Sequence, residues 1–222
     1  PLVPHARPQP IEPAEVAALL RSLRTRPHVL PEFEERPQQQ AMAQAVAEAF
    51  NEDGQLIVEA GTGIGKSLAY LLPAACYALR NNARVVISTA TINLQDQLTT
   101  KDIPAVQRLL AGSAPDQQPL AAAQRKGQRN YLCLRRHLAA RQSSFLSDEE
   151  ARFLLRLLLW LPQTESGDRA ELRLSPAEEM LWYRFSAQNE DCLGSSCPFV
   201  PDGSCFLVRA RQRAEAAHLV VV

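Results

Sequence analysis

One eight-residue string of this chain has the residue types and the spacing that bind a nucleoside triphosphate. Residues 60–67 read Ala-Gly-Thr-Gly-Ile-Gly-Lys-Ser and are called the phosphate loop below. Glycine lets the backbone curl so that successive N–H groups point at phosphate oxygens, and a helix that starts at the loop adds its positive dipole end. Lys66 and Ser67 are the candidate catalytic residues, because the ammonium neutralises outer phosphates and the hydroxyl binds magnesium. The string therefore predicts an ATP site with these contacts: Ala60, Gly61, Thr62, Gly63, Ile64, Gly65, Lys66 and Ser67.

The residues around the phosphate loop are of the kind that such a loop requires. An apolar run at residues 56–58 precedes it and favours a strand, and the run at residues 68–72 favours a helix. The general pattern has glycine where this chain has Ala60, and the alanine variant is typical of helicase motors. A glycine turn without a ligand, between a strand and a helix, is the alternative interpretation. The flanking runs favour ATP binding.

Composition limits the class of protein. The chain has 222 residues, of which 46% are hydrophobic and 22% are charged, as in ordinary globular domains. Lys+Arg and Asp+Glu both number 24, so the net charge predicts no partner. No apolar run approaches the length of a membrane span, and no secretory signal opens the chain. We expect no membrane partner, and because the chain starts at Pro1 and stops in an apolar run we expect a fragment.

Periodicity along the chain predicts an α/β fold with a parallel sheet. The spacing of apolar residues predicts these elements in order: a helix at residues 38–50 with Met42, Val46 and Phe50 on one face, a strand at 56–58, a helix at 66–79, a strand at 85–88 and a helix at 92–100. Pro73 is expected to kink the second of these helices or end it early. Strands that alternate with helices form parallel sheets.

The pattern changes in the second half, which divides the chain into three parts. Residues 1–31 are rich in proline and are expected to be a linker or the tail of an upstream module. Residues 112–205 form an insertion between the second and third strands, opening on a polar, turn-rich stretch at residues 112–118. The sheet domain comprises residues 32–111 and 206–222, with a helix at 206–217 and a strand at the end.

Two helices of the insertion have starts that can be read from the sequence. Ser147 with Glu150, and Ser175 with Glu178, have the spacing of a capping box, in which the serine and the acid each bond the other's backbone N–H. The first helix should bury the apolar face that follows its cap: Phe153, Leu154, Leu157, Leu158 and Leu161. The insertion is therefore expected to be mainly helical.

Four of the five cysteines fall in this insertion. Cys133, Cys192, Cys197 and Cys205 are separated by 58, 4 and 7 residues, without a secretory signal that would favour disulfides. The last three lie on a loop that is too short and too interrupted by proline to bury itself, so ligation by thiolates would stabilise it. Four thiolates suit either a tetrahedral zinc ion or an iron–sulfur cluster, and free cysteines that fill the core are the third interpretation. Cys76, in an apolar helix, is expected in the core.

A basic run precedes and follows the first of these cysteines. Residues 124–141 hold six Lys or Arg and no acid. Four of the basic side chains would follow a phosphate backbone: Lys126, Arg129, Arg135 and Arg136. Tyr131 would offer a face on which a base stacks. A solvated, charged helix face is the alternative interpretation.

Together these strings resemble the XPD/DinG-type iron–sulfur DNA helicases of superfamily 2, over roughly residues 30–222. Residues 33–39 look like the adenine-recognition motif, with Arg36 and Gln39 at its matching positions. A glutamine suits that place, because an amide pairs with both the donor and the acceptor of adenine. Residues 59–73 match the first motif of the family almost throughout.

Further strings extend the resemblance in the order of the family. Residues 89–98 resemble the next motif, whose hydroxyls and backbone amides touch DNA, and place three candidate DNA contacts: Thr89, Thr91 and Gln95. Residues 126–133 resemble the segment that leads to the first cluster ligand, and residues 205–211 the segment after the fourth. Gln128 departs from the pattern, since relatives often carry a second basic residue there.

The resemblance implies the front half of a first RecA-like motor domain with an iron–sulfur insertion. It implies ATP and magnesium as cofactors, and a 4Fe–4S cluster held by the four cysteines of the insertion. The activity it implies is ATP-dependent movement, 5′ to 3′, on single-stranded DNA in repair or replication. We accordingly expect a cytoplasmic monomer, with single-stranded-DNA-binding or replication proteins as partners.

The resemblance also implies what this stretch of chain lacks. It holds no Asp-Glu-Ala-His string, which carries the Walker B function in such motors, and no second motor domain, so the isolated chain should not turn over ATP. Two other classes remain open from the residues: a nuclease-linked protein with a degenerate ATPase, and a zinc-stabilised module that grips nucleic acid and binds ATP only structurally.

Overall fold

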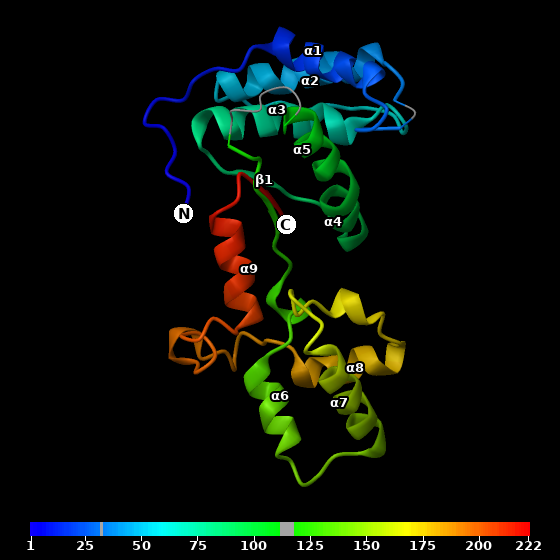
Figure 1. Ribbon diagram of the computed structural model, residues 1–222, viewed down its shortest axis with the longest axis vertical. Coiled ribbons are helices and arrows are strands. Elements are labelled where there is room, and N and C mark those ends of the chain that lie inside the picture. The colour runs from blue at the N-terminus through cyan, green and yellow to red at the C-terminus, as the bar shows by residue number, and fades with distance from the viewer. Residues whose placement is uncertain (32, 112–117) are drawn as a thin grey trace. The chain divides into compact units, whose positions relative to one another are not determined.

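The chain forms two compact units. The computed structural model describes residues 1–31, 33–111 and 118–222. The first unit comprises Pro1–Gln124 with Ala214–Val222, and the second comprises Arg125–Arg213 (Figure 1). Most of the turn-rich stretch expected at residues 112–118 lies outside the described residues. Among the residues that are described, no helix combines the length and the apolar content needed to span a bilayer.

Three helices of the first unit pack on one another: α1 (Pro13–Ser22), α2 (Pro37–Asn51) and α3 (Lys66–Asn81) (Figure 1). The predicted helix at 38–50 is confirmed, but its most buried residues are Gln39, Ala43 and Ala47. The residues that the spacing predicts on one face, Met42, Val46 and Phe50, are only partly buried. Alanine has little side chain, so Ala43 and Ala47 let α2 approach α3 closely.

The segment before α2 also packs into this unit. Ile11, Val16 and Leu20, from the stretch assigned to a linker or an upstream tail, are at most 1% exposed and belong to the main hydrophobic core. The Asn51 side chain receives the N–H of Ile11 at 2.8 Å and donates to its carbonyl at 2.8 Å. These bonds hold the entry to α1 against the end of α2.

Helix α3 continues past its internal proline. Pro73 was expected to kink the helix or end it early, yet α3 runs on to Asn81, so the early end is wrong. Proline removes one backbone donor from a helix. Here Pro73 is buried with Leu71, Leu72 and Ala74, and this packing stabilises the helix across the missing bond.

The sheet of the first unit has three parallel strands in the order β1-β3-β2. They are β1 (Val85–Ile87), β2 (Ala122–Gln124) and β3 (Leu219–Val221). Parallel pairing aligns Val85 with Leu219 on one side of β3, and Ala122 with Leu219 on the other. The two predicted strands at 85–88 and at the end of the chain are confirmed, whereas β2 was missed.

The predicted strand before the phosphate loop is wrong for this structure. Residues 56–58 form no strand and pair with no other strand among the described residues. Ile57 is 97% exposed, and Leu56 and Val58 are 43% and 41% exposed. A strand is defined by backbone pairing with a neighbour, which local sequence cannot supply.

A nearly continuous helical run follows β1. It begins as α4 (Ile92–Gln97), loosens into the π-helical turn η2 (Leu98–Asp102) and ends as α5 (Ile103–Ala111). The helix predicted at residues 92–100 is therefore longer in the structure. Ile103, Val106 and Leu109 of α5 are buried in the main core of the first unit.

The second unit is mainly helical, as predicted. Its helices are α6 (Leu134–Arg141), α7 (Asp148–Trp160), α8 (Pro176–Phe185) and α9 (Phe206–Glu215), the last of which ends in the first unit's residues. Both predicted capping boxes are present, at the starts of α7 and α8. Short 3₁₀ turns also occur among the described residues of both units, as η1 (Leu23–Thr25), η3 (Gln128–Asn130), η4 (Arg169–Leu172) and η5 (Gly194–Ser196).

Aromatic side chains fill the core of this unit. Phe153 of α7 and Phe185 of α8 meet edge to face, with ring centroids 5.5 Å apart. Trp182 is 2% exposed, and its indole N–H donates to the Arg129 carbonyl at 2.8 Å. The predicted inner face of α7 is confirmed, since Phe153, Leu154 and Leu157 are buried in the same cluster.

Candidate functional site

The phosphate loop has the backbone form that its glycines predict. Gly63 and Gly65 have φ = +83° and +79°, a region that other residues rarely adopt, and α3 begins directly afterwards at Lys66. Gly61, Thr62, Gly63 and Lys66 are exposed, so the loop is open to a ligand. An open loop at a helix start presents unpaired N–H groups and a positive dipole end, which together bind phosphate.

The Lys66 ammonium is folded back onto this loop. Its Nζ donates to the carbonyl of Ala60 at 2.8 Å and to that of Gly61 at 3.0 Å. A triphosphate bound at the helix start would offer charged oxygens in place of these neutral carbonyls, and charge-assisted bonds are roughly twice as strong. Lys66 is therefore positioned to exchange loop carbonyls for phosphate oxygens when a nucleotide binds.

The Ser67 hydroxyl has a neighbour that sequence reasoning missed. Burial raises the pKa of Tyr70, one turn further along α3, and a side-chain hydrogen bond with Ser67 opposes that shift. Tyr70 is therefore a neighbour of Ser67 within the same helix. Helical spacing, i to i+3, is the signal that could have found Tyr70.

Arg36 and Gln39, which the family resemblance predicts as adenine-recognition residues, both contact the phosphate loop. The Arg36 guanidinium donates to the carbonyl of Gly63 and pairs with Glu34 at 2.8 Å. Gln39 donates from Nε2 to the carbonyl of Gly65 at 2.9 Å and is 3% exposed. The structure thus brings both predicted residues to the loop, with their donors on its backbone.

The predicted DNA contacts of the next motif lie where β1 ends and α4 begins. Thr91 is the N-cap of α4, and its hydroxyl accepts the N–H of Leu94 at 3.3 Å. The Thr89 hydroxyl donates to the Thr91 carbonyl at 3.1 Å, and the Gln95 side-chain oxygen accepts from Gln124 at 3.4 Å. Thr91 is exposed, and Thr89 and Gln95 are half-buried. The carboxyl ends of strands in open α/β sheets are where ligands bind.

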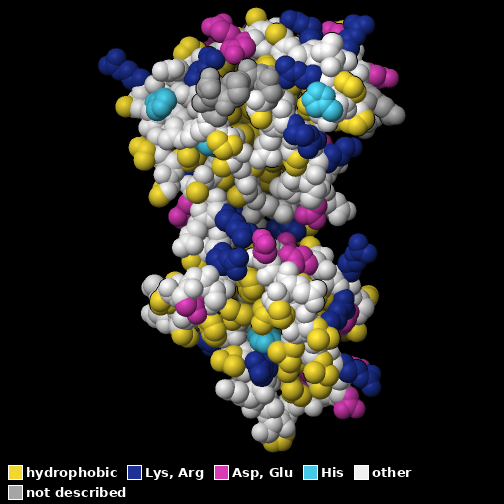
Figure 2. Space-filling view, in the orientation of Figure 1, with side chains coloured by type: hydrophobic (Ala, Val, Ile, Leu, Met, Phe, Trp, Pro, Cys, Tyr) yellow, Lys and Arg dark blue, Asp and Glu magenta, His cyan; other side chains and the backbone are white. Residues whose placement is uncertain are grey.

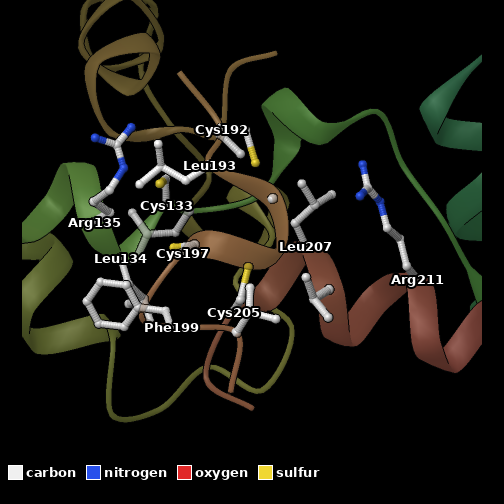
Figure 3. A pocket seen from close by; sticks show the side chains of 15 residues that line it. Cys133, Leu134, Arg135, Cys192, Leu193, Cys197, Phe199, Cys205, Leu207 and Arg211 are labelled. Carbon is white, nitrogen blue, oxygen red and sulfur yellow. The ribbon is translucent and has the colours of Figure 1, made fainter. Parts of the chain in front are cut away.

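The four cysteines of the insertion line one cavity of the second unit (Figure 3). Cys197 is buried, Cys133 and Cys205 are half-buried, and Cys192 is exposed. The walls of this cavity are mostly apolar, and they include Leu132, Phe199, Leu207 and Val208. Figure 3 shows the sulfurs of Cys192 and Cys205 pointing inward from opposite sides. Within the described chain, no three His, Cys, Asp or Glu side chains converge as ligands of a single metal ion.

The surroundings of these thiols fit a cationic group between them. Cys133 is the N-cap of α6, and Cys205 directly precedes α9, so each of these two sulfurs lies at the start of a helix. Burial raises the pKa of Cys205, and the neighbouring Cys197 and Cys133 raise it further, while N–H groups of Val208 and Leu207 lower it. Four cysteines that line one apolar cavity are a donor set that zinc or an iron–sulfur cluster binds through sulfur.

Cys76 behaves as predicted for a core residue. It packs against the main cluster of the first unit, and burial raises the pKa of its thiol to about 12. Such a thiol stays protonated near neutral pH and is a poor ligand.

Two residues of the basic run are interior. The Lys126 ammonium lies 2.7 Å from a carboxylate oxygen of Asp168, and the lysine is 6% exposed. Tyr131 is 4% exposed, and its hydroxyl accepts the backbone N–H of Lys126 at 3.0 Å. The burial of Lys126 and Tyr131 leaves little of either for a phosphate or a base. Sequence reasoning missed Asp168, which lies far along the chain from Lys126.

The other predicted DNA contacts of the run lie nearer the surface. Arg129 is exposed. Arg135 donates to the carbonyl of Asp191 and lines the four-cysteine cavity, and Arg136 pairs with the Asp191 carboxylate. Lys and Arg side chains are interspersed with Asp and Glu on the face seen in Figure 2.

Comparison with known proteins gives the family. Residues 36–116 match the model of the DEAD/DEAH box helicases. The chain is 42% identical over 198 residues to the ATP-dependent helicase DinG of Mycobacterium tuberculosis H37Rv, which covers 82% of this chain and 29% of that protein. It is 38% identical over 196 residues to the ATP-dependent DNA helicase YoaA of Escherichia coli K12, with 87% and 29% covered. The chain belongs to the DinG-type helicases of superfamily 2.

A third relative of this DinG-type chain has a different name. It is the 3′-5′ exonuclease DinG of Bacillus subtilis, 35% identical over 193 residues, with 87% of this chain and 20% of that protein covered. This DinG-type chain thus spans less than a third of the length of these relatives. The stretch that matches the helicase family model contains Arg36, Gln39 and the phosphate loop. The small parallel sheet of the first unit, together with its flanking helices, fits a RecA-like α/β domain.

Proposed function

We propose that this chain is the ATP-binding part of the motor of an ATP-dependent DNA helicase. The observation that carries the proposal is the phosphate loop, which has left-handed glycines, an exposed mouth and Lys66 at the start of α3. Lys66 would bind the outer phosphates, and Ser67 would hold the magnesium ion that neutralises their charge. Membership of the DinG-type family supports this assignment.

Single-stranded DNA is the proposed track. Thr89, Thr91 and Gln95 at the end of β1 and Arg129 on the second unit would contact its phosphates. Movement from 5′ to 3′, a role in repair or replication and partners that bind single-stranded DNA follow from the family resemblance. A monomer in the cytoplasm is part of the same proposal. No Asp-Glu-Ala-His string occurs in these 222 residues, so hydrolysis and unwinding are proposed for the complete protein.

We also propose that Cys133, Cys192, Cys197 and Cys205 hold a 4Fe–4S cluster. The apolar cavity that all four line, and the two helix starts at Cys133 and Cys205, support it. The cluster would supply a covalent brace to a loop with little core of its own. A zinc ion in the same place is the alternative, and it would make the second unit a zinc-stabilised module.

A nuclease-linked protein is the second candidate function. The observation that favours it is the name of the Bacillus subtilis relative, an exonuclease. In that class the motor is degenerate, and the phosphate loop would bind ATP without driving movement. The intact Lys66 and Ser67 favour a working motor over this class.

The unwinding of a labelled duplex with a single-stranded 5′ tail tests the proposal. The complete protein should unwind it only with ATP and magnesium, and Lys66→Ala should abolish unwinding because the outer phosphates lose their cation. A duplex with a 3′ tail is the control for direction. Strand cleavage without ATP-driven unwinding, unchanged by Lys66→Ala, would favour the nuclease-linked class instead.

A further inference from the structure

The side chain of Gln39 packs against the backbone of the phosphate loop and bonds to it. Its side-chain nitrogen donates to the Gly65 carbonyl at 2.9 Å, and only 3% of the residue is exposed. A residue that reads adenine must offer both its amide oxygen and its amide nitrogen to the base. Here one N–H of that amide is already committed to the loop backbone.

The contact between Gln39 and Gly65 is close on more than one atom. A Cβ added to Gly65 would lie 2.1 Å from Nε2 of Gln39 and 3.0 Å from Cδ of the same side chain. The amide therefore rests directly against the α-carbon of Gly65, in the space that any other residue would need. The small Ala43 and Ala47 on the same helix bring α2 near enough to α3 for this contact.

The bond to Gly65 sets the direction of the next N–H group. The Gly65 carbonyl accepts from Gln39 and also from the N–H of Ala69, at 3.3 Å, in the first turn of α3. The peptide bond is planar and trans, so fixing this carbonyl turns the N–H of Lys66 the opposite way. That N–H is the first donor of the helix, at the end where a phosphate binds.

Arg36 does the same for the other left-handed glycine. Its guanidinium donates to the Gly63 carbonyl. Two side chains at the start of α2 thus hold the carbonyls of the two loop residues with positive φ, Gly63 and Gly65. Both contacts are made to the backbone of the phosphate loop.

We propose that Gln39 is a positioning residue for the phosphate loop, and that it strengthens nucleotide binding independently of the base. The proposal rests on the proposed ATP site. It differs from the adenine-reading role that the sequence predicts, because it assigns the effect of Gln39 to the triphosphate. Replacing Gln39 should therefore weaken the binding of every triphosphate ligand by the same factor, with or without a base.

The test compares three ligands, ATP, GTP and inorganic tripolyphosphate, each with magnesium, on the 222-residue chain. Gln39→Met keeps the length of the side chain and removes the donor. We expect its dissociation constants to rise by the same factor for all three, roughly 3–10-fold, the value of one hydrogen bond. Gln38→Met, an exposed neighbour on the same helix, is the matched control and should change none of them.

The outcomes separate the two roles of Gln39. A loss confined to ATP, with GTP and tripolyphosphate unchanged, would mean that Gln39 reads adenine and would overturn the proposal, as would no loss at all. Melting temperatures of the ligand-free variants show that binding is measured on folded protein, and Gln39→Leu, which also removes the donor without adding a charge, replaces Gln39→Met if the latter does not fold. If the unchanged chain binds none of the three ligands, the proposed ATP site fails instead.

Discussion

The ring of Phe206 occupies the space beside Gly167, where a Cβ would lie 2.3 Å from the ring carbon Cγ. Gly167 has φ = +66°, and its carbonyl accepts the N–H of Leu132 at 2.9 Å. Leu132 precedes Cys133 in the sequence, and Phe206 follows Cys205. One glycine therefore aligns the two segments that carry the first and last cysteines of the cavity.

Gly167→Ala should disturb both segments. The added methyl meets a buried ring at a position with positive φ, so we expect a loss of about 2–4 kcal/mol in the free energy of unfolding and a lower metal content. Urea unfolding and iron analysis measure the two effects. Gly203→Ala is the matched control, because Gly203 has φ = +73° but nothing within 4 Å of the added methyl. Equal losses in both variants would contradict the steric role of Gly167.

Lys126→Ala should destabilise the second unit without acting on DNA directly. The substitution leaves the Asp168 carboxylate without its partner 2.7 Å away, and losing one member of a buried pair costs about 3–5 kcal/mol. Urea unfolding measures this loss. Lys126→Ala should leave the salt dependence of DNA binding unchanged when it is measured on folded protein.

Arg129→Ala should show the opposite pattern. Arg129 is exposed, so its loss should leave the unfolding free energy within about 0.5 kcal/mol. Losing one phosphate contact should lower the slope of log affinity against log salt by about 0.7 for single-stranded DNA. Salt titrations of binding to an oligonucleotide measure the slope. An unchanged slope in Arg129→Ala, with a lowered slope in Lys126→Ala, would reverse the two assignments.

Glu178 should make the stability of the second unit depend on pH. The pKa of Glu178 is lowered to about 2. The largest cause is a hydrogen bond from Arg156, and the second is the capping-box bond from the backbone N–H of Ser175. Because this pKa lies below that of the unfolded chain, the stabilisation is present above about pH 5 and is lost as the pH falls towards 2. We expect Glu178→Gln to cost about 1 kcal/mol at pH 7, after solvent screening, and almost nothing near pH 2. Urea unfolding at pH 7 and near pH 2 measures this change in the free energy of unfolding, and Glu179→Gln, at an exposed position, is the control. An equal cost of Glu178→Gln at the two pH values would contradict the predicted pH dependence.

The metal of the cysteine cavity should be iron. Protein purified without air should be brown and contain about four irons and four sulfides, and Cys197→Ser should bleach it. Cys76→Ser is the control, because Cys76 lies in the core of the first unit and should keep the colour. A colourless protein with one zinc would favour the zinc-stabilised module, and a metal-free protein would make the four cysteines packing residues.

Features set by neighbours in the sequence could be predicted. The capping boxes at Ser147 and Ser175 depend on residues three positions apart, and both are present. The phosphate loop likewise depends on glycines within six residues, and Gly63 and Gly65 adopt the φ values that the pattern needs.

Features set by distant residues could not be predicted. Residues 56–58 have the composition of a strand but pair with no other strand in the described chain, and β2 is missed because Ala122 and Ala123 carry no strand signal. Lys126 looks like a phosphate contact until Asp168 is placed beside it. The role of Gln39 depends in the same way on its distance from Gly65, which only the packing of α2 on α3 sets.

The most direct test of the ATP site is a titration of the 222-residue chain with ATP and magnesium. One saturable site is predicted, and Lys66→Ala should weaken it at least tenfold, since a charge-assisted bond to phosphate is worth about 1.5–3 kcal/mol. Arg80→Ala is the control, because Arg80 is a basic residue of α3 whose side chain bonds to Glu15 and to the Pro10 carbonyl. This variant should bind ATP as the unchanged chain does. No binding, or binding that Lys66→Ala leaves intact, would contradict the assignment of the phosphate loop.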